Sequence, residues 1–318
     1  MKHVLAGVLA LTLGTGSAQA QNGPVAIGTL PQGSLGYSIA AGIAQVVDRS
    51  TGTMARAVGQ GGSSVYVPSL NRGEIAFATS NAFEAVFAIE GRGNFDGQPN
   101  PEVRVAAMLQ PFAVGFMVAV DGDIHCISDL AGRTFPVGYA RQRLVGVMQE
   151  ALFEAAGLEE ESLDAVPVAN FVEGANMLAQ GIVEGVLLAP GSGVVQQTNA
   201  RRAVRFISAV ESEEMADKLA VSLPGSYLLR VEPSDRMPEI AEPVDLLGYQ
   251  YTLITHAGAY EELVYKVVKA LYENREALVE THGSFRGFNP EDMANQVEGA
   301  IFHPGAIRFF REVGIWSE

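Results

Sequence analysis

Cysteine and positive charge are both scarce in this sequence. Cys126 is the only cysteine, so the chain can form neither an intramolecular disulfide nor a cysteine-rich zinc site. Its 21 Lys and Arg residues are outnumbered by 36 Asp and Glu residues, which gives a net charge of −15. This balance disfavours nucleic acid and anionic membrane surfaces as partners, because both require a cationic face. A small organic anion remains possible, since it responds to the local field of a cleft.

Long apolar runs are missing beyond the N-terminus. Lys2 precedes a nearly unbroken apolar run at 4–13, and residues 17–20 supply the small residues that signal peptidase requires. A run of about ten apolar residues is too short to span a bilayer, which favours a signal peptide at 1–20 with cleavage before Gln21. The alternative is a buried first helix of a cytosolic protein. We therefore expect a mature chain that is exported to the periplasm and is not embedded in a membrane.

The patterns of common enzyme sites are also absent. The histidines at 3, 125, 256, 282 and 303 are scattered and lack the spacing of a metal site. His303 is more typical of a packing or capping residue. Gly191-Ser192-Gly193 lacks the context of a nucleophile elbow, and 59–62 is not a dinucleotide fingerprint. We expect no catalytic residue, no metal ligand, no cofactor and no enzymatic activity.

Strand and helix patterns alternate along the mature chain. This alternation predicts an α/β fold with parallel strands and helices on both faces. Two apolar runs, at 103–109 and 115–120, indicate two strands in series where the chain passes between lobes. The other expected strands lie at 25–29, 54–58, 75–79, 134–137, 165–168, 183–188 and 249–255, and the helices at 37–48, 65–72, 144–156, 174–180 and 260–280.

The order of these elements predicts two α/β lobes with a ligand cleft between them. Lobe I is expected to comprise 21–116 together with 248–318, and lobe II to comprise 117–247. In open sheets of this kind ligands bind beyond the carboxyl ends of the strands, where several loops converge.

Short motifs follow one another in a characteristic order. They lie at 27–29, 61–64, 70–75, 128–133, 154–158, 178–193 and 303–312, of which the last is the most specific. In this order they resemble the TAXI-type solute receptors of tripartite ATP-independent periplasmic (TRAP) transporters over nearly the whole mature length.

The resemblance implies a type II periplasmic-binding-protein fold that closes on its ligand. It also implies a small carboxylate ligand, such as glutamate, 2-oxoglutarate or a dicarboxylate. This ligand would be delivered to TRAP membrane permease subunits driven by an ion gradient. Two other hypotheses stay open, namely the binding protein of an ABC-type uptake system and a periplasmic enzyme on the same fold.

Two loops depart from the family pattern. Residues 30–32 replace part of its glycine-rich first loop, and residues 138–143 stand where many members carry a loop of small residues. Arg141 and Arg143 come just before a predicted helix, whose N-terminus favours an anion. Because residues at i and i+2 do not share a helix face, we expect one guanidinium to point into the cleft. The alternative is that both are solvated residues of the first helical turn.

The remaining candidate ligand residues follow predicted strands. Hydroxyl groups and bare backbone N–H groups there can hold a carboxylate. Ordinary alternatives are helix capping for Ser34, turn chemistry for Ser80 and Asn81, and core packing for Phe171. These candidates are Ser34, Tyr37, Gly61, Gly62, Ser63, Ser80, Asn81, Tyr139, Gln142, Asn170, Phe171 and Ser192.

Overall fold

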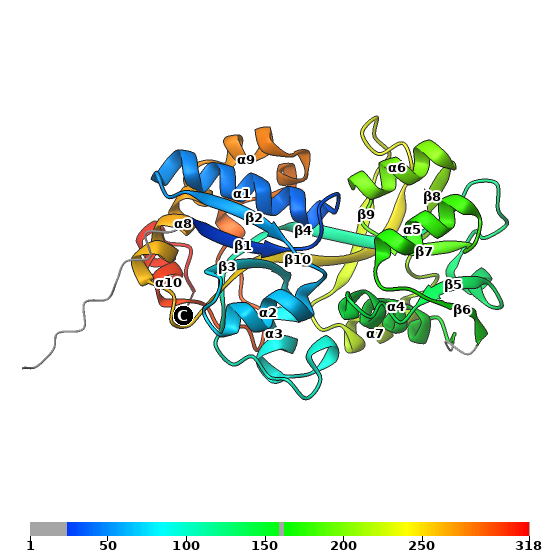
Figure 1. Cartoon of the computed structure of the whole chain (residues 1–318), viewed down its shortest axis with the longest axis horizontal. Coiled ribbons are helices and arrows are strands. Elements are labelled where there is room, and N and C mark those ends of the chain that lie inside the picture. The colour runs from blue at the N-terminus through cyan, green and yellow to red at the C-terminus, as the bar shows by residue number, and fades with distance from the viewer. Residues whose placement is uncertain (1–23, 159–161, 318) are drawn as a thin grey trace, which may run out of the picture.

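The computed structural model describes residues 24–158 and 162–317. Within them the chain forms an α/β structure of two lobes, which lie side by side in Figure 1. This architecture confirms the fold class that the strand–helix alternation predicts. The predicted signal peptide at 1–20 lies outside the described residues.

A large sheet of the described strands continues through both lobes. Its order is β2-β1-β3-β10-β4-β7, with β8 beside β4 and β9 beside β10. The sheet is mixed, not purely parallel as expected, because β10 runs antiparallel to β3 and β4. A separate parallel pair is formed by β5 and β6. The strands are β1 (Val25–Thr29), β2 (Ala55–Gly59), β3 (Phe77–Asn81), β4 (Val103–Ala119), β5 (Thr134–Val137), β6 (Asp164–Pro167), β7 (Gly185–Leu188), β8 (Val204–Phe206), β9 (Tyr227–Val231) and β10 (Val244–His256).

The long strands β4 and β10 pass from one lobe to the other. The expectation of two strands in series at 103–109 and 115–120 is wrong, since β4 is continuous through the intervening residues. Pro111 lacks a backbone N–H and is the exposed residue within β4. It is tolerated there because its partner Gln250 lies beside a register shift, where a bulge interrupts the ladder.

The helices cover the sheet in two groups (Figure 1). The first lobe carries α1 (Leu35–Thr51), α2 (Ser63–Asn71), α3 (Ala82–Glu90), α8 (Glu261–Glu273), α9 (Arg275–Thr281) and α10 (Pro304–Val313). The second lobe carries α4 (Arg143–Ala155), α5 (Phe171–Gln180), α6 (Gly193–Arg201) and α7 (Glu213–Ser222). Short 3-10 segments are η1 (Gly93–Phe95), η2 (Ile127–Leu130), η4 (Gly283–Gly287) and η5 (Pro290–Asp292).

One predicted helix is divided in the structure. The pattern at 260–280 predicts a single helix, whereas α8 and α9 are separated at Asn274. Asn274 leaves the helical region, with φ −125° and ψ 41°, and its side-chain amide donates to the carbonyl oxygen of Ala270 at 2.8 Å. Asparagine competes for backbone groups in this way, which explains why the apolar periodicity continues through a break.

The C-terminal motif has a structural role that begins at His303. Its Nδ1 atom accepts a hydrogen bond from the backbone N–H of Gly305 at 3.1 Å and caps α10, and Pro304 follows at the first helical position. Phe309 and Phe310 are fully buried. This confirms the expected capping or packing role of His303.

Protonation of His303 is expected to destabilise the fold. Burial lowers the pKa of His303 below its ordinary value of 6.5. A base whose pKa is lowered on folding contributes stability that is present above its unfolded-state pKa and is lost as the pH falls below it. In His303→Asn, which keeps a capping acceptor but cannot titrate, we expect a smaller loss of unfolding free energy between about pH 7 and about pH 5. Urea denaturation at several pH values measures both slopes. Equal slopes in the wild type and in His303→Asn would contradict the assignment of this pH dependence to His303.

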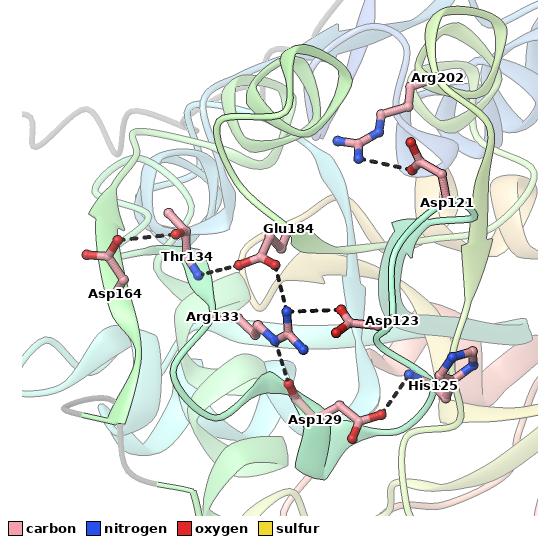
Figure 2. A network of polar contacts seen from close by, with 9 residues as sticks. All are labelled: Asp121, Asp123, His125, Asp129, Arg133, Thr134, Asp164, Glu184 and Arg202. Carbon is pink, nitrogen blue, oxygen red and sulfur yellow. Dashed lines mark hydrogen bonds and ion pairs between the residues drawn. The ribbon is translucent and has the colours of Figure 1, made fainter.

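A polar network braces the far end of the second lobe (Figure 2). The guanidinium of Arg133 contacts Asp123 at 3.0 Å and Glu184 at 3.1 Å. Its Nε donates to the carbonyl oxygen of Asp129, and Glu184 also accepts from the backbone N–H of Thr134 at 3.0 Å. These contacts attach the start of β5 to the segments that follow β4 and precede β7. None of these residues lines the cavity described below, so the network stabilises the lobe.

Candidate functional site

A cavity lies between the two lobes. It holds about 710 Å³ of empty space, including space at its mouth that is open to solvent. Most of its exposed lining surface is apolar, and polar side chains interrupt it, which is the usual composition of a small-molecule site. The polar side chains of the lining are those of Ser34, Ser63, Tyr66, Ser80, Asn81, Glu84, Gln142, Ser192, Tyr249 and Tyr251.

Aromatic residues of the two crossing strands form one wall of the cavity. Phe112 on β4 stacks on Tyr249 and Tyr251 of β10, with ring centroids 5.4 Å and 4.7 Å apart. The hydroxyl of Tyr251 donates to Thr79 Oγ1 at 3.0 Å. Burial raises the pKa of both tyrosines, so they remain neutral phenols. This wall is aromatic and uncharged.

Helix N-termini converge on the cavity from both lobes. The N-cap residues of five helices line it, as does the first residue of α5. Each helix start presents unpaired backbone N–H groups and the positive end of a dipole. The cavity is therefore suited to an anion although no Lys or Arg belongs to its lining. The residues are Ser34 (α1), Gly62 (α2), Asn81 (α3), Gln142 (α4), Phe171 (α5) and Ser192 (α6).

Two buried amide groups in the lining have unused donors. Asn81 is 3% exposed and Gln142 is 2% exposed, and neither Asn81 Nδ2 nor Gln142 Nε2 has a hydrogen-bond partner within the described structure. Gln142 Oε1 accepts from the backbone N–H of Phe171 at 2.9 Å, which orients its amide. A buried donor without a partner is costly, so each such group requires an explanation. Acceptor atoms of a bound ligand would satisfy both amides at once, from opposite lobes.

Glu84 adds a carboxyl group to the same cavity. It is 1% exposed, and it accepts hydrogen bonds from Ser80 Oγ and from Asn94 Nδ2, both at 2.8 Å. Burial raises the pKa of Glu84, although hydrogen bonds from Ser63, Ser80, Asn94 and the backbone of Asn81 oppose the rise. These partners are all neutral, so the carboxyl has no cation to balance it in this wall.

The lobes are in backbone contact at two places beside the cavity. A Cβ atom added at Gly62 would overlap the carbonyl oxygen of Arg141 and lie 3.1 Å from Gln142 Cα. On the other side, the N–H of Val194 donates to the carbonyl oxygen of Gly33 at 3.3 Å, and a Cβ at Gly193 would lie 3.2 Å from that oxygen. The structure is thus a closed arrangement of the two lobes, and glycine permits their approach.

The structure brings together eight of the residues that the sequence nominates. The lining contains Ser34, Gly62, Ser63, Ser80, Asn81, Gln142, Phe171 and Ser192. The hydroxyl of Ser34 is already engaged, since it donates to the carbonyl oxygen of Pro31 and accepts from the N–H of Tyr37. Ser34 and Ser192 therefore cap their helices and also face the cavity.

The other nominated residues do not line the cavity. Tyr37 lies beside Gly59, and Gly61 directly precedes the lining residue Gly62. Tyr139 is fully buried, with its hydroxyl donating to Gln149 Oε1 at 3.1 Å. Asn170 caps α5 by accepting from the N–H of Glu173.

Neither Arg141 nor Arg143 places its guanidinium in the cavity. Both side chains are exposed, and the residue between them, Gln142, turns inward as the N-cap of α4. The structure thus favours the solvated alternative over the expected clamp.

We expect Arg141→Ala and Arg143→Ala each to change carboxylate affinity by less than about threefold, because exposed charges contribute little. Calorimetric titration measures the effect. A tenfold loss in either variant would support a clamp that forms in solution.

Glu84 and the tyrosines of the wall are among the lining residues that were not predicted from the sequence. The sequence does contain a pattern that indicates Glu84. Asn81 is a typical N-cap residue, and an acidic residue three positions later often accepts a hydrogen bond from the N-cap backbone. That pattern predicts the start of α3, which the sequence reading left unassigned. The tyrosines belong to β10, and only the pairing of distant strands places them.

The part of the chain that the structure describes contains neither a membrane-crossing helix nor a cluster of metal-binding side chains. No helix in residues 24–158 and 162–317 is long and apolar enough to cross a membrane. In the same residues, no group of three or more His, Cys, Asp or Glu side chains is arranged to hold a metal ion.

Comparison with known proteins places this geometry in a recognised group. The sequence model of the NMT1-like family matches residues 27–314. A solved periplasmic transporter structure covers 92% of this chain and 92% of its own length, with 14% identity and a TM-score of 0.55.

Two further solved structures carry ligands. MatC from Rhodopseudomonas palustris with bound malate is 11% identical over 83% of this chain and 89% of its own, with a TM-score of 0.57. The alkanesulfonate-binding protein SsuA from Xanthomonas axonopodis pv. citri, bound to MOPS, is 11% identical over 93% and 95%, with a TM-score of 0.52. At such identities these similarities show the fold, which is the two-lobed fold of periplasmic binding proteins.

Proposed function

This chain belongs to the NMT1-like family, and from that membership and its cavity we propose that it is a periplasmic solute-binding subunit that captures a small carboxylate. The observation that carries the proposal is the pair of buried, unpartnered amide donors, Asn81 Nδ2 and Gln142 Nε2, on opposite lobes. Acceptor oxygens of one carboxylate ligand would satisfy both.

A carboxylate in this cavity would be held without an ion pair. The surrounding helix N-termini supply N–H groups and the positive ends of dipoles, and the apolar lining lowers the local dielectric, so these interactions are stronger than in water. Closed lobes exclude competing water. The overall negative charge of the chain does not oppose this binding, because the field inside the cavity depends on the groups that line it.

Binding would stabilise the closed arrangement. A ligand that contacts Asn81 in one lobe and Gln142 in the other binds the closed state better than an open state, and it shifts the population accordingly. The lobe boundaries that we propose, at 116/117 and 247/248, lie within two residues of the points where the strand partners change. From Gly115 on, β4 pairs with β7, and Gly248 is the last residue of β10 that pairs with β9.

The closed receptor would deliver its ligand to TRAP membrane permease subunits. The ordered motifs that resemble TAXI-type receptors, including the tail at 303–312, support this assignment. The alternative is the binding protein of an ABC-type uptake system. A neighbouring gene for a large permease with many membrane spans, and no ATPase gene beside it, favours the first. Turnover assays on carboxylates test the remaining enzyme hypothesis.

A thermal-shift screen of the mature chain tests the proposal. The panel would contain glutamate, 2-oxoglutarate, succinate and other carboxylates, with neutral solutes of equal size as comparators. A bound carboxylate at about a hundred times its Kd is expected to add about 2.7 kcal/mol of stability. Stabilisation by neutral solutes alone would contradict the carboxylate assignment, and stabilisation by none of the solutes would contradict the receptor function.

A further inference from the structure

Glu84 places a carboxyl group without a cationic partner in the cavity. It lies in the first turn of α3, belongs to the cavity lining and is 1% exposed. Its Oε2 accepts from Ser80 and its Oε1 from Asn94, and Ser63 and the backbone of Asn81 add further hydrogen bonds. All four partners are neutral, and the cavity lining contains no Lys or Arg. A positive group of the ligand is therefore the partner that this carboxyl lacks.

Helix capping alone does not explain the position of Glu84 in the cavity. An acidic residue at the third helical position can accept from the N-cap backbone. Glu173 holds that position in α5 and accepts from the backbone N–H of Ala169 at 2.7 Å, yet it is half-buried and does not line the cavity. Glu84, by contrast, is removed from solvent among neutral partners, where an ionised carboxyl is costly unless a positive group joins it.

The lining as a whole has three kinds of surface. Asn81 Nδ2, Gln142 Nε2 and the helix N-termini offer donors. Glu84 offers an acceptor. The remaining wall is apolar and includes Val145 and Met148 on α4. This set is complementary to a ligand that combines a carboxylate, a separate donor group and an apolar body.

We propose that Glu84 is a specificity-determining residue that pairs with an ammonium group of the ligand. The preferred solutes are accordingly amino acids with an apolar side chain. This inference rests on the proposed carboxylate-binding function and names the ligand class of the same site.

Matched probes test the inference on the mature chain by calorimetric titration. L-leucine carries an ammonium group, α-hydroxyisocaproate carries a hydroxyl in its place, and isocaproate carries neither. L-phenylalanine and hydrocinnamate form a second pair with a larger side chain. The wild type is expected to bind each amino acid at least about tenfold more tightly than its analogue without an ammonium group, as for a buried hydrogen bond between charged groups.

The variant Glu84→Gln should reduce the preference for L-leucine over isocaproate to less than about threefold, because the uncharged amide can still receive a hydrogen bond but cannot balance an ammonium group. It should leave the affinity for isocaproate within about twofold. The control Glu173→Gln removes a carboxyl from the corresponding helix position outside the cavity and should keep the full preference. A merely structural role of Glu84 would weaken all probes equally.

Two results would overturn the inference. One is equal affinity of the wild type for L-leucine and isocaproate, which needs no variant and so remains decisive if Glu84→Gln does not fold. The other is an unchanged preference in Glu84→Gln. Binding of dicarboxylates with no binding of these probes also overturns the inference while the proposed function stands, whereas binding of no carboxylate at all overturns both.

Discussion

Replacing Gly62 by alanine is expected to weaken ligand binding by about tenfold to a hundredfold. The added Cβ would overlap the carbonyl oxygen of Arg141 across the contact between the lobes. Both partners are backbone groups at helix N-termini, so neither can move aside as a flexible side chain would. Overpacking of this kind costs about 1–3 kcal/mol, which corresponds to this loss of affinity. The cost applies to the closed arrangement, and the separate lobes should fold normally.

The adjacent residue gives the control for this variant. A Cβ at Gly61 would find its nearest neighbour at 3.7 Å, which is ordinary van der Waals contact. Gly61→Ala should therefore bind like the wild type. Calorimetry gives the affinities, and small-angle X-ray scattering shows whether the ligand still compacts each variant. Wild-type affinity and compaction in Gly62→Ala would contradict the closure of the lobes at this contact.

The variant Asn81→Ala is expected to lose at least about tenfold in carboxylate affinity without losing stability. Its side chain makes no capping hydrogen bond to α3, and its Nδ2 is buried without a partner. Removing an unsatisfied donor relieves a desolvation cost in the free protein. The same removal deprives the bound ligand of a hydrogen bond. The effects on folding and on binding therefore have opposite signs, which urea denaturation and calorimetry measure separately.

Asn170→Ala serves as the opposite case. Asn170 is also an N-cap, but it accepts a hydrogen bond from the N–H of Glu173 at 3.0 Å and does not line the cavity. Losing such a cap costs about 1 kcal/mol of stability, and ligand affinity should be unchanged. If Asn81→Ala instead behaved like Asn170→Ala, Asn81 would be a structural cap and not a ligand contact.

Much of the fold could be predicted from local sequence patterns. Strands bounded by glycine and helices with apolar periodicity, such as α1 and α4, lie where the patterns indicate them, because both signals are local. The predictions that failed depended on individual contacts that the apolar pattern does not encode. The continuity of β4 through Pro111 depends on the bulge opposite Gln250, and the break at Asn274 depends on one side-chain hydrogen bond.

The residues of the candidate site that lie at strand ends and helix starts could be predicted from the sequence. Ser63 and Gln142 line the cavity because they begin helices whose strands end at the same edge of the fold. Which side chain of a loop points into the cavity could not be predicted. The charges of Arg141 and Arg143 indicate an anion site, but the buried hydrogen bond of Gln142 to Phe171 decides which side chain points inward. Glu84 was missed because its importance arises from burial, and burial depends on tertiary packing.

The central claim is that both lobes hold one carboxylate through Asn81 and Gln142. The most direct test is calorimetric titration of the carboxylate that stabilises the mature chain most, into the wild type and into the double variant Asn81→Ala/Gln142→Leu. We predict one site in the wild type and an affinity lower by about a hundredfold or more in the folded double variant, as expected for two buried hydrogen bonds. Equal affinities in the two proteins would contradict the claim.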